Sequence, residues 1–332
     1  MLTVSVLGLG LIGGSLLRAL GAAGVPAVGY DAAPSTRTEA AAAGCEIADS
    51  VADAADRAEL VVLAMPLPAV PSVLDELAAA GYRGILTDVT SVKSPVYALV
   101  ASHLPGARYV GGHPMAGKET SGFATSDPGL FTGCAWALCL EPGPATEPAP
   151  GPARLADWLT VAELLTRLGV RVVPATPVEH DTAVARISHL PHLTATALAA
   201  ATGGGLAATL GAGSYRDATR VAASRPGLVA AMCGGNAAAL APVLDDLIER
   251  LQEARRRLDA AEPTPALTEW LLPGHTARAS WPPTGGEPRR LHVTAESLVA
   301  LGRSGGWLTD VSPDRRAVAA VHPAEATPGT TA

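Results

Sequence analysis

Short runs of apolar residues alternate with amphipathic stretches through the first half of the chain. The apolar runs have the length of buried strands, and the stretches between several of them have helical spacing. Strands are predicted at 4–7, 27–30, 60–64, 85–88, 109–112, 135–140 and 170–173, and helices at 70–79, 92–104 and 155–168, with a helical pattern also running up to residue 20. Such alternation predicts a mostly parallel sheet with right-handed helical crossovers. The stretch 141–152, rich in Pro, Gly and Ala, is expected to be a surface loop within this domain, because the pattern resumes after it.

The pattern changes at Pro177, where strand signals stop and helical stretches continue to about Leu258. The strongest of these helices carries an apolar stripe at Leu244, Leu247, Ile248, Leu251 and Leu258. A stripe of this kind faces either the chain's own core or a second copy of the chain. Residues 262–288 are rich in Pro and Gly and are expected to form a linker. Two strand-like runs, 291–293 and 307–311, then flank a short helix at 295–301. The predicted divisions are therefore a parallel-sheet domain at 1–175, an all-α domain at 176–262, and a linker with a small C-terminal appendage at 263–332.

Composition excludes several classes of protein. The 332 residues carry a net charge of −7 and no basic run longer than 255–257, so nucleic acid is not an expected partner. No uncharged apolar stretch reaches the length of a membrane span, and the first residues do not have the pattern of a signal peptide. The four cysteines are scattered without the spacing of zinc ligands, which suits thiols in a reducing compartment. A cytoplasmic location is expected.

The first apolar run leads into a glycine-rich turn that is typical of dinucleotide binding. Gly8, Gly10 and Gly13 form the pattern G-x-G-x-x-G between a strand and a helix, and Asp31 follows at the end of the next strand. The glycines allow a tight turn and a close approach of a pyrophosphate, and the N–H groups that open the helix, from Leu11 onward, attract its charge. The Asp31 carboxylate would bind the ribose hydroxyls and repel a 2′-phosphate, which favours NAD over NADP. The competing interpretation is an ordinary glycine-rich turn in an α/β protein that binds no nucleotide.

Three polar clusters follow predicted strands, at Met65-Pro66, at 90–93 (Thr90-Ser91-Val92-Lys93) and at 113–117, which opens with His113. Ligands of doubly wound sheets bind outside the carboxyl ends of the strands, so we expect these clusters to meet near a nicotinamide. Removing a hydride from a carbon that bears a hydroxyl requires a group that accepts the hydroxyl proton, and a neutral histidine does this near physiological pH. His113 is therefore the candidate base, although it could simply cap the following turn. Ser91, or Ser94, could likewise do no more than cap the helix that starts near Pro95.

The helical half carries a second cluster, His180-Asp181 followed by Ser188, His189 and His192. Ser188 and His192 are four residues apart and therefore share one helix face. A metal site made of the three histidines and Asp181 is conceivable, but no Cys or further carboxylate completes it at the usual spacing. A helix face that contacts substrate is the preferred interpretation, and no metal is expected.

Five motifs follow one another along the chain, namely Gly-Leu-Gly-Leu-Ile-Gly-Gly-Ser at 8–15, Asp-Val-Thr-Ser-Val-Lys at 88–93, Gly-His-Pro-Met-Ala-Gly at 112–117, Ser-His-Leu-Pro-His at 188–192 and Ala-Thr-Arg-Val-Ala at 218–222. Together they resemble the prephenate and arogenate dehydrogenase family. The resemblance covers about residues 1–260. It implies a Rossmann-type domain followed by a helical dimerisation domain, and hence a homodimer. It also implies NAD-dependent oxidative decarboxylation of prephenate to 4-hydroxyphenylpyruvate, a step of tyrosine biosynthesis, or, as the alternative, conversion of arogenate to tyrosine.

The resemblance also implies roles for individual residues. His113 would accept the proton of the ring hydroxyl, and Ser91 would orient His113 and the nicotinamide. Ser188, His192 and Arg220 would line the substrate pocket, with Arg220 paired to a substrate carboxylate. Glu119 would help to gate that pocket. The cofactor would contact Gly8, Gly10, Leu11, Ile12, Gly13, Asp31, Met65, Pro66 and Thr90.

Substrate choice depends on charges near the side chain in which the two substrates differ. Lys118 would favour the pyruvyl group of prephenate and repel the ammonium of arogenate, whereas Glu119 would do the reverse. Only two lysines occur in the chain, Lys93 and Lys118, and both lie within motifs, so we favour prephenate. Thr120 and Val229 stand where many relatives carry Lys and Trp, which affects the detail of recognition. The rival hypotheses are a dehydrogenase of the same architecture that acts on a β-hydroxy acid or an imine, and an NAD-sensing protein without activity.

Overall fold

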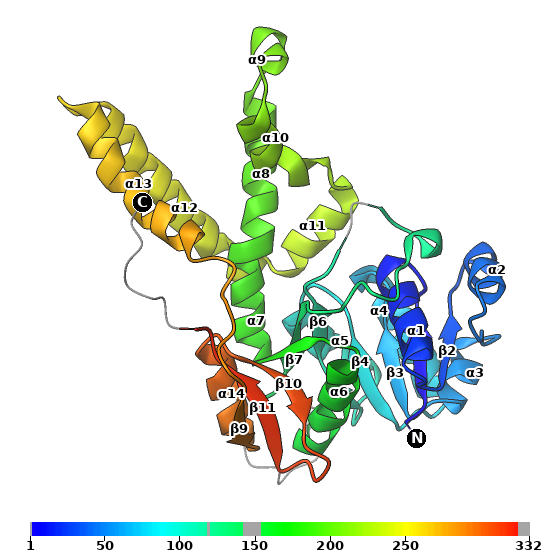
Figure 1. The fold of residues 1–332 in the computed structure, drawn as a ribbon. Coiled ribbons are helices and arrows are strands. Elements are labelled where there is room, and N and C mark those ends of the chain that lie inside the picture. The colour runs from blue at the N-terminus through cyan, green and yellow to red at the C-terminus, as the bar shows by residue number, and fades with distance from the viewer. Residues whose placement is uncertain (1, 118–119, 142–153, 325–332) are drawn as a thin grey trace. The chain divides into compact units, whose positions relative to one another are not determined.

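A computed structural model describes residues 2–117, 120–141 and 154–324 (Figure 1). They divide into two compact units, one made of Met1–Asp181 and Pro288–Val321 and the other of Thr182–Glu287 with the residues that follow from His322.

The first unit contains a five-stranded parallel sheet, as the alternating pattern predicted. Its spatial order is β2-β1-β3-β4-β5, formed by β1 (Val4–Leu7), β2 (Ala27–Tyr30), β3 (Leu60–Leu63), β4 (Ile85–Asp88) and β5 (Arg108–Val110). The connecting helices are α1 (Leu11–Ala22), α2 (Pro34–Ala42), α3 (Val51–Asp56), α4 (Val70–Ala79) and α5 (Ser94–His103), with a 3₁₀ turn, η1 (Leu67–Ala69), before α4. The strand order reverses between β1 and β3, and this switch point is where doubly wound sheets bind ligands.

The two faces of this sheet are covered by different helices. On β3, Leu60 and Val62 belong to an apolar cluster that includes residues of α1 and of α6 (Leu155–Arg167). Val61 and Leu63 belong to a second cluster, with residues of α3, α4 and α5. Because side chains alternate along a strand, each strand contributes to both clusters, and the sheet is fixed from both sides.

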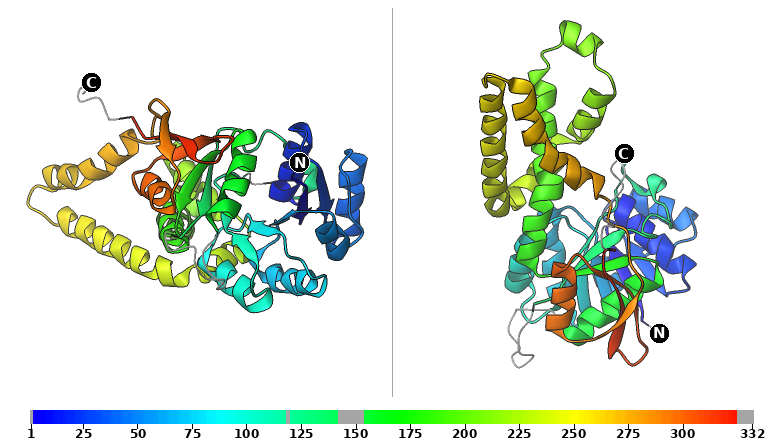
Figure 2. Two further views of the ribbon diagram at one scale, coloured as in Figure 1. Left: turned by 90° about the horizontal axis from the view of Figure 1, so that it is seen from below. Right: turned by 60° about the vertical axis from the view of Figure 1, so that its left-hand side comes forward.

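A second, six-stranded sheet completes the first unit and includes the C-terminal strands (Figure 2). Its order is β6-β7-β8-β10-β11-β9, formed by β6 (Gly112–Pro114), β7 (Ala135–Cys139), β8 (Arg171–Ala175), β9 (Arg289–His292), β10 (Trp307–Val311) and β11 (Ala317–Val321). Within the C-terminal segment predicted at 263–332, residues 289–321 therefore belong to this sheet and to the first unit. Leu308 of β10 pairs with Val172 of β8, and α14 (Ala295–Arg303) packs on β8.

The second unit is helical from residue 182 onward. It contains the end of α7 (Pro177–Val184), a π-helical turn at Ala185–His189, α8 (Leu190–Ala201), α9 (Gly205–Thr209), α10 (Gly213–Thr219), a 3₁₀ turn η4 (Arg220–Ala223), α11 (Pro226–Gly235), α12 (Ala237–Leu258) and α13 (Pro263–Ala279). The linker predicted at 262–288 is wrong for most of its length, because α13 lies there. Pro263 occupies the first turn of α13, where its missing N–H costs nothing. The helix α13 packs on α12 (Figure 2). An ion pair joins Arg257 of α12 to Glu269 of α13 at 3.0 Å.

The apolar stripe of α12 is only partly covered, with Leu244 and Leu247 half-buried. Ile248, Leu251 and Leu258 are 44%, 53% and 54% exposed, so the interpretation that they face the chain's own core is wrong. The apolar cluster of this unit is small, with Leu240 and Val243 as its α12 members. Over the described ranges, no single helix is long and apolar enough to cross a membrane, although α11 and α12, bent by 97°, pass that test as a pair by length and composition.

Candidate active site

The glycine-rich turn between β1 and α1 is shaped by close backbone contacts. Gly8 has a φ of +96°, and a Cβ atom there would lie 2.6 Å from the carbonyl oxygen of Ala64. A Cβ on Gly13 would lie 1.9 Å from the carbonyl oxygen of Gly8, so only glycine lets the helix pack against the turn. At Gly10 the same atom would meet nothing within 4 Å. The turn is therefore closed toward β3 and open at Gly10, which suits the close approach of a phosphate.

The start of α1 presents backbone donors beside this open face. Gly10 is the N-cap, and the first intrahelical bond runs from Gly14 N–H to the Gly10 carbonyl at 2.8 Å. The N–H groups of Leu11, Ile12 and Gly13 are therefore those that a helix leaves without an intrahelical acceptor. Together with the positive end of the helix dipole, they fit a diphosphate.

Asp31 lies directly after β2, next to the glycine-rich turn. Its carboxylate accepts hydrogen bonds from Leu9 N–H at 2.7 Å and Ala33 N–H at 2.9 Å. Arg37 donates to the Asp31 carbonyl at 2.6 Å and lies over the ring of Tyr30, so its guanidinium is held by the backbone. A fixed carboxylate at the end of the second strand fits the ribose hydroxyls of NAD. Met65 and Pro66 follow β3, at the same edge of the sheet as Gly8.

A buried charge cluster lies at the end of β4. Asp88 and Lys93 have no exposed side-chain surface and form an ion pair. Asp88 also accepts hydrogen bonds from the Tyr109 hydroxyl at 2.7 Å and from Gly112 N–H at 2.9 Å, and Lys93 donates to the Gly112 carbonyl at 2.6 Å. The cluster therefore ties the loop after β4 to the residue that precedes His113. This role of Lys93 was not predicted, although the scarcity of lysine in the chain was a signal for it.

Thr90 and Ser91 lie in the loop that follows β4. The Thr90 hydroxyl bonds to Asp88 and, at 2.9 Å, to the Val92 carbonyl, so it belongs to the buried cluster. Ser91 is half-buried in the same loop. Neither Ser91 nor Ser94 caps α5 with its side chain, so the predicted serine cap is wrong.

The cap of α5 comes from Asp181, on the distant helix α7. Its carboxylate accepts the backbone N–H groups of Lys93 at 2.7 Å and Ser94 at 2.8 Å. Burial acts to raise the pKa of the Asp181 carboxyl, but the hydrogen bonds from His180, Ser94 and Lys93 outweigh it and lower the pKa to about 2. Asp181 is therefore ionised near neutral pH.

His113 lies on β6, opposite Ala137 of β7, and is half-buried. Its Nδ1 atom lies 2.9 Å from Nε2 of His180, and the two rings meet edge to face at 72°. His180 Nδ1 lies in turn 2.9 Å from Oδ1 of Asp181. Burial lowers the pKa of His180, with a further contribution from the nearby Lys93 ammonium, so that this imidazole is neutral. The structure thus gives His113 a partner that the sequence analysis treated as part of a different cluster.

The remaining predicted site residues lie in the second unit. Ser188 is in the π-helical turn, and its carbonyl lies 2.8 Å from Nδ1 of His192 on α8. Arg220 is exposed at the start of η4, a turn that packs on α8. His189 is fully buried, with its Nδ1 3.1 Å from the Asn236 amide, so it serves the core of this unit.

Two of the predicted residues, Lys118 and Glu119, lie outside the described residues. Thr120, described beside them, is exposed, and Val229 is half-buried on α11. In the part of the chain that the structure describes, no group of three or more His, Cys, Asp or Glu side chains could hold a metal ion.

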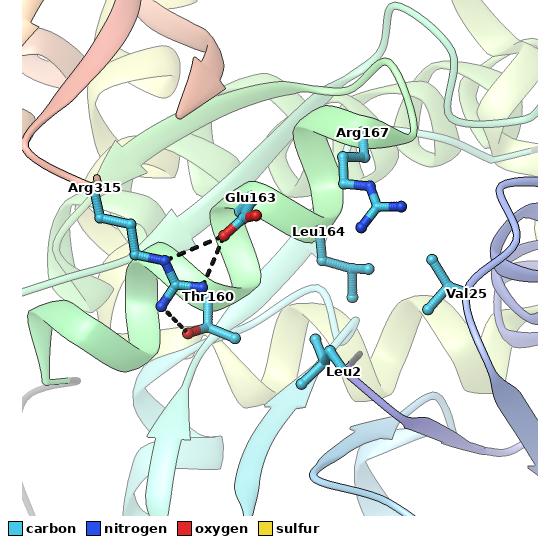
Figure 3. A pocket seen from close by; sticks show the side chains of 7 residues that line it. All are labelled: Leu2, Val25, Thr160, Glu163, Leu164, Arg167 and Arg315. Atoms are coloured by element: carbon cyan, nitrogen blue, oxygen red, sulfur yellow. Dashed lines mark hydrogen bonds and ion pairs between the residues drawn. The ribbon is translucent and has the colours of Figure 1, made fainter. Parts of the chain in front are cut away.

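A hollow of about 230 Å³ lies elsewhere on the first unit (Figure 3). It is lined by Leu2, Val25, Thr160, Glu163, Leu164, Arg167 and Arg315. Leu2 precedes β1, so the hollow is at the opposite end of that strand from Gly8. Arg315 bonds to Glu163 at 2.8 Å and to Thr160 at 3.0 Å, and these contacts hold the turn after β10 against α6. This hollow is separate from the candidate chemistry.

Comparison with known proteins identifies relatives over most of the chain. The family description "Prephenate dehydrogenase, nucleotide-binding domain" matches residues 15–174, and "Prephenate dehydrogenase, dimerization domain" matches residues 176–272. The chain is 35% identical over 263 residues to a cyclohexadienyl dehydrogenase of Zymomonas mobilis, covering 76% of this chain and 87% of the relative.

Solved structures agree with this result. A protein of Corynebacterium glutamicum, provisionally named a prephenate dehydrogenase, is 38% identical with a TM-score of 0.78 over 85% of this chain and 90% of its own. A prephenate dehydrogenase from A. aeolicus, solved in complex with hydroxyphenyl propionate and NAD⁺, is 26% identical with a TM-score of 0.74 over 84% of this chain and 98% of its own.

Proposed function

Because the chain belongs to the prephenate dehydrogenase family, we propose that it oxidatively decarboxylates prephenate to 4-hydroxyphenylpyruvate with NAD as the oxidant. In this reaction the ring carbon that bears the hydroxyl gives a hydride to NAD, the hydroxyl loses its proton, and the ring carboxylate leaves as CO₂. The gain of aromaticity drives the reaction forward. The protein has to bind the two reactants, accept one proton and hold the departing groups in place.

His113 is proposed to accept the hydroxyl proton. The observation that carries this assignment is its position, half-buried on β6 beside the loop that ends β4, at the carboxyl edge of the parallel sheet. The backbone of Gly112, just before it, is tied to Asp88 and Lys93, so the imidazole starts from a fixed strand. Ser91, in the loop after β4, is proposed to orient the nicotinamide and the reacting histidine when the cofactor is bound.

NAD is proposed to bind at the glycine-rich turn and the N-terminus of α1. NAD supplies the hydride acceptor. The open face at Gly10, the donors at residues 11–13 and the fixed Asp31 carboxylate all fit it. Met65, Pro66 and Thr90 would border the nicotinamide end, with Thr90 acting through the backbone because its hydroxyl is used inside the protein.

Ser188, His192 and Arg220 are proposed to contact substrate. They share one unit, and the turn that carries Arg220 packs on the helix that carries His192. The planar guanidinium of Arg220 suits bidentate binding of a substrate carboxylate. Lys118 and Glu119 remain the candidates that select between the pyruvyl and amino side chains.

A second copy of this chain is the proposed partner of the helical unit. The matched family description for residues 176–272 is that of a dimerization domain. Leu271 and Leu272 on α13 are 57% and 60% exposed. Together with the exposed apolar residues of α12, they offer an apolar face that a second copy would cover.

An absorbance assay for NADH, with prephenate and arogenate side by side, tests the proposal. We expect NADH to form with prephenate, and more slowly with arogenate. Turnover of arogenate alone would establish the alternative activity. Two results would establish a rival function. One is turnover of a β-hydroxy acid or an imine but of neither cyclohexadienol, and the other is NAD binding without any turnover.

A further inference from the structure

Three buried or half-buried side chains form a hydrogen-bonded line that ends at the proposed base. It runs from Asp181 through His180 to His113, with both connecting distances at 2.9 Å, and His180 and Asp181 are each only 3% exposed. We propose that His180 and Asp181 are positioning residues that fix the tautomer of His113, so that its lone pair is on Nε2 and receives the substrate's hydroxyl proton. This inference rests on the proposed function, in which His113 is the base.

Asp181 forms the buried end of the line. A carboxylate can only accept hydrogen bonds, and Asp181 already accepts the N–H groups of Lys93 and Ser94. The pKa of Asp181, about 2, keeps it ionised. Its contact with His180 therefore requires that Nδ1 of His180 carries the hydrogen atom.

The middle residue passes this constraint to His113. Burial disfavours the charged form of His180, and the Lys93 ammonium opposes its protonation as well, whereas the Asp181 and Asp88 carboxylates favour it. The net result is a neutral ring with hydrogen on Nδ1 and a lone pair on Nε2. Nδ1 of His113 faces that lone pair and must donate to it, so the lone pair of His113 itself is on Nε2.

The same line stabilises the product of proton transfer. The hydroxyl O–H bond of the substrate breaks, an N–H bond forms at Nε2 of His113, and the imidazolium keeps its Nδ1–H bond to His180. A hydrogen bond donated by a cation is stronger than one donated by a neutral group, and Asp181 polarises the acceptor. No proton has to leave His113 toward His180.

The tautomers can be measured directly by ¹⁵N–¹H correlation spectra of the histidine rings in the protein without substrate. We expect His113 and His180 each to carry hydrogen on Nδ1 at neutral pH. His180→Phe keeps a ring but removes both nitrogens, and should convert His113 to a mixture of tautomers. The matched control is His103→Phe, because His103 also lies 2.7 Å from a carboxylate, that of Asp75, but on the surface at the end of α5. The control should leave the His113 signals unchanged.

Kinetics provide a second readout. His180→Phe should lower kcat by about 10–10²-fold, the effect of removing a partner that orients a functional histidine, with the KM for NAD unchanged. On the acid side of the pH profile (its acid limb), kcat/KM falls as His113 becomes protonated. In the variant this fall should occur at a pH about one unit lower, which corresponds to a tenfold loss of preference for the protonated form of His113. A merely structural role would lower the yield of folded protein without moving this limb. Asp181→Asn should shift the limb in the same direction by less, and it decides the question if His180→Phe does not fold.

Two results would overturn the inference. One is hydrogen on Nε2 of His113 in the wild-type protein, and the other is a His180→Phe variant with unchanged His113 signals and an unchanged acid limb. Failure of the proposed function is distinguishable from either, because it would appear as an absence of NADH formation from both cyclohexadienols, while the ring spectra would still report the tautomers.

Discussion

Replacing Lys93 by methionine should cost the first unit a large part of its stability. Methionine keeps the unbranched shape and most of the volume of lysine, so the change removes mainly the charge. The Lys93 ammonium bonds to Asp88, to the Gly112 carbonyl at 2.6 Å and to the Thr90 hydroxyl at 3.2 Å. In the variant, Asp88 keeps its donors from Thr90, Tyr109 and Gly112 but loses its only cation among the described contacts.

The magnitude follows from the complete burial of both side chains. Removing one partner of a buried ion pair leaves an uncompensated charge and costs about 3–5 kcal/mol. For a unit of this size, with a shift of 2–4 °C for each kcal/mol, that corresponds to a fall in Tm of about 6–20 °C. Differential scanning calorimetry of the whole chain measures this directly.

Two variants serve as controls for this prediction. Arg315→Met removes an ion pair to Glu163 in which the side chains are 41% and 42% exposed, and should cost less than about 1 kcal/mol. The double variant Lys93→Met/Asp88→Asn should be more stable than Lys93→Met, because no charge is left buried. The reasoning would be refuted if Lys93→Met lowered the stability of the protein no more than Arg315→Met does.

Three further predictions concern cofactor and substrate. Asp31→Ser should narrow the preference for NAD over NADP, measured as the ratio of the two kcat/KM values, and a wild-type enzyme that already uses both equally would contradict the role of Asp31. Arg220→Ala should raise the KM for prephenate by an amount equivalent to about 2–5 kcal/mol, with NAD binding unchanged, and an unaltered KM would mean that Arg220 does not contact substrate. Lys118→Glu should shift kcat/KM from prephenate toward arogenate, and a wild-type enzyme that turns over arogenate well and prephenate hardly at all would identify Glu119 as the selector.

The parallel sheet could be predicted because its signals are local. The strands β1 to β4 are short and mostly apolar runs, and Gly8 and Gly13 have backbone requirements that only glycine meets. The same local signals led to two errors. The prolines of 262–288 predicted a linker, but Pro263 is tolerated in the first turn of a helix, and contact with α12 supports the rest of α13. The strands after residue 288 looked isolated because their pairing with β8 spans more than a hundred residues of sequence.

The environment of the base was the least predictable part of the site. His113 could be identified from its motif, but its partner His180 is 67 residues away. The cap of α5 was assigned to nearby serines, because sequence patterns relate a cap only to its neighbours, whereas the acceptor is Asp181, 88 residues from Lys93. Such long-range contacts depend on the packing of α7 and cannot be read from spacing.

The most direct test of the proposed activity is to follow NADH, CO₂ and 4-hydroxyphenylpyruvate together, with prephenate and saturating NAD, in the wild-type protein and in His113→Asn. We predict that the wild type forms the three products in equal amounts, and that the variant loses about 10²–10⁴-fold in kcat while its affinity for NAD is unchanged, as expected for the loss of a general base. Formation of NADH without CO₂, or a variant with a near-normal rate, would contradict this account.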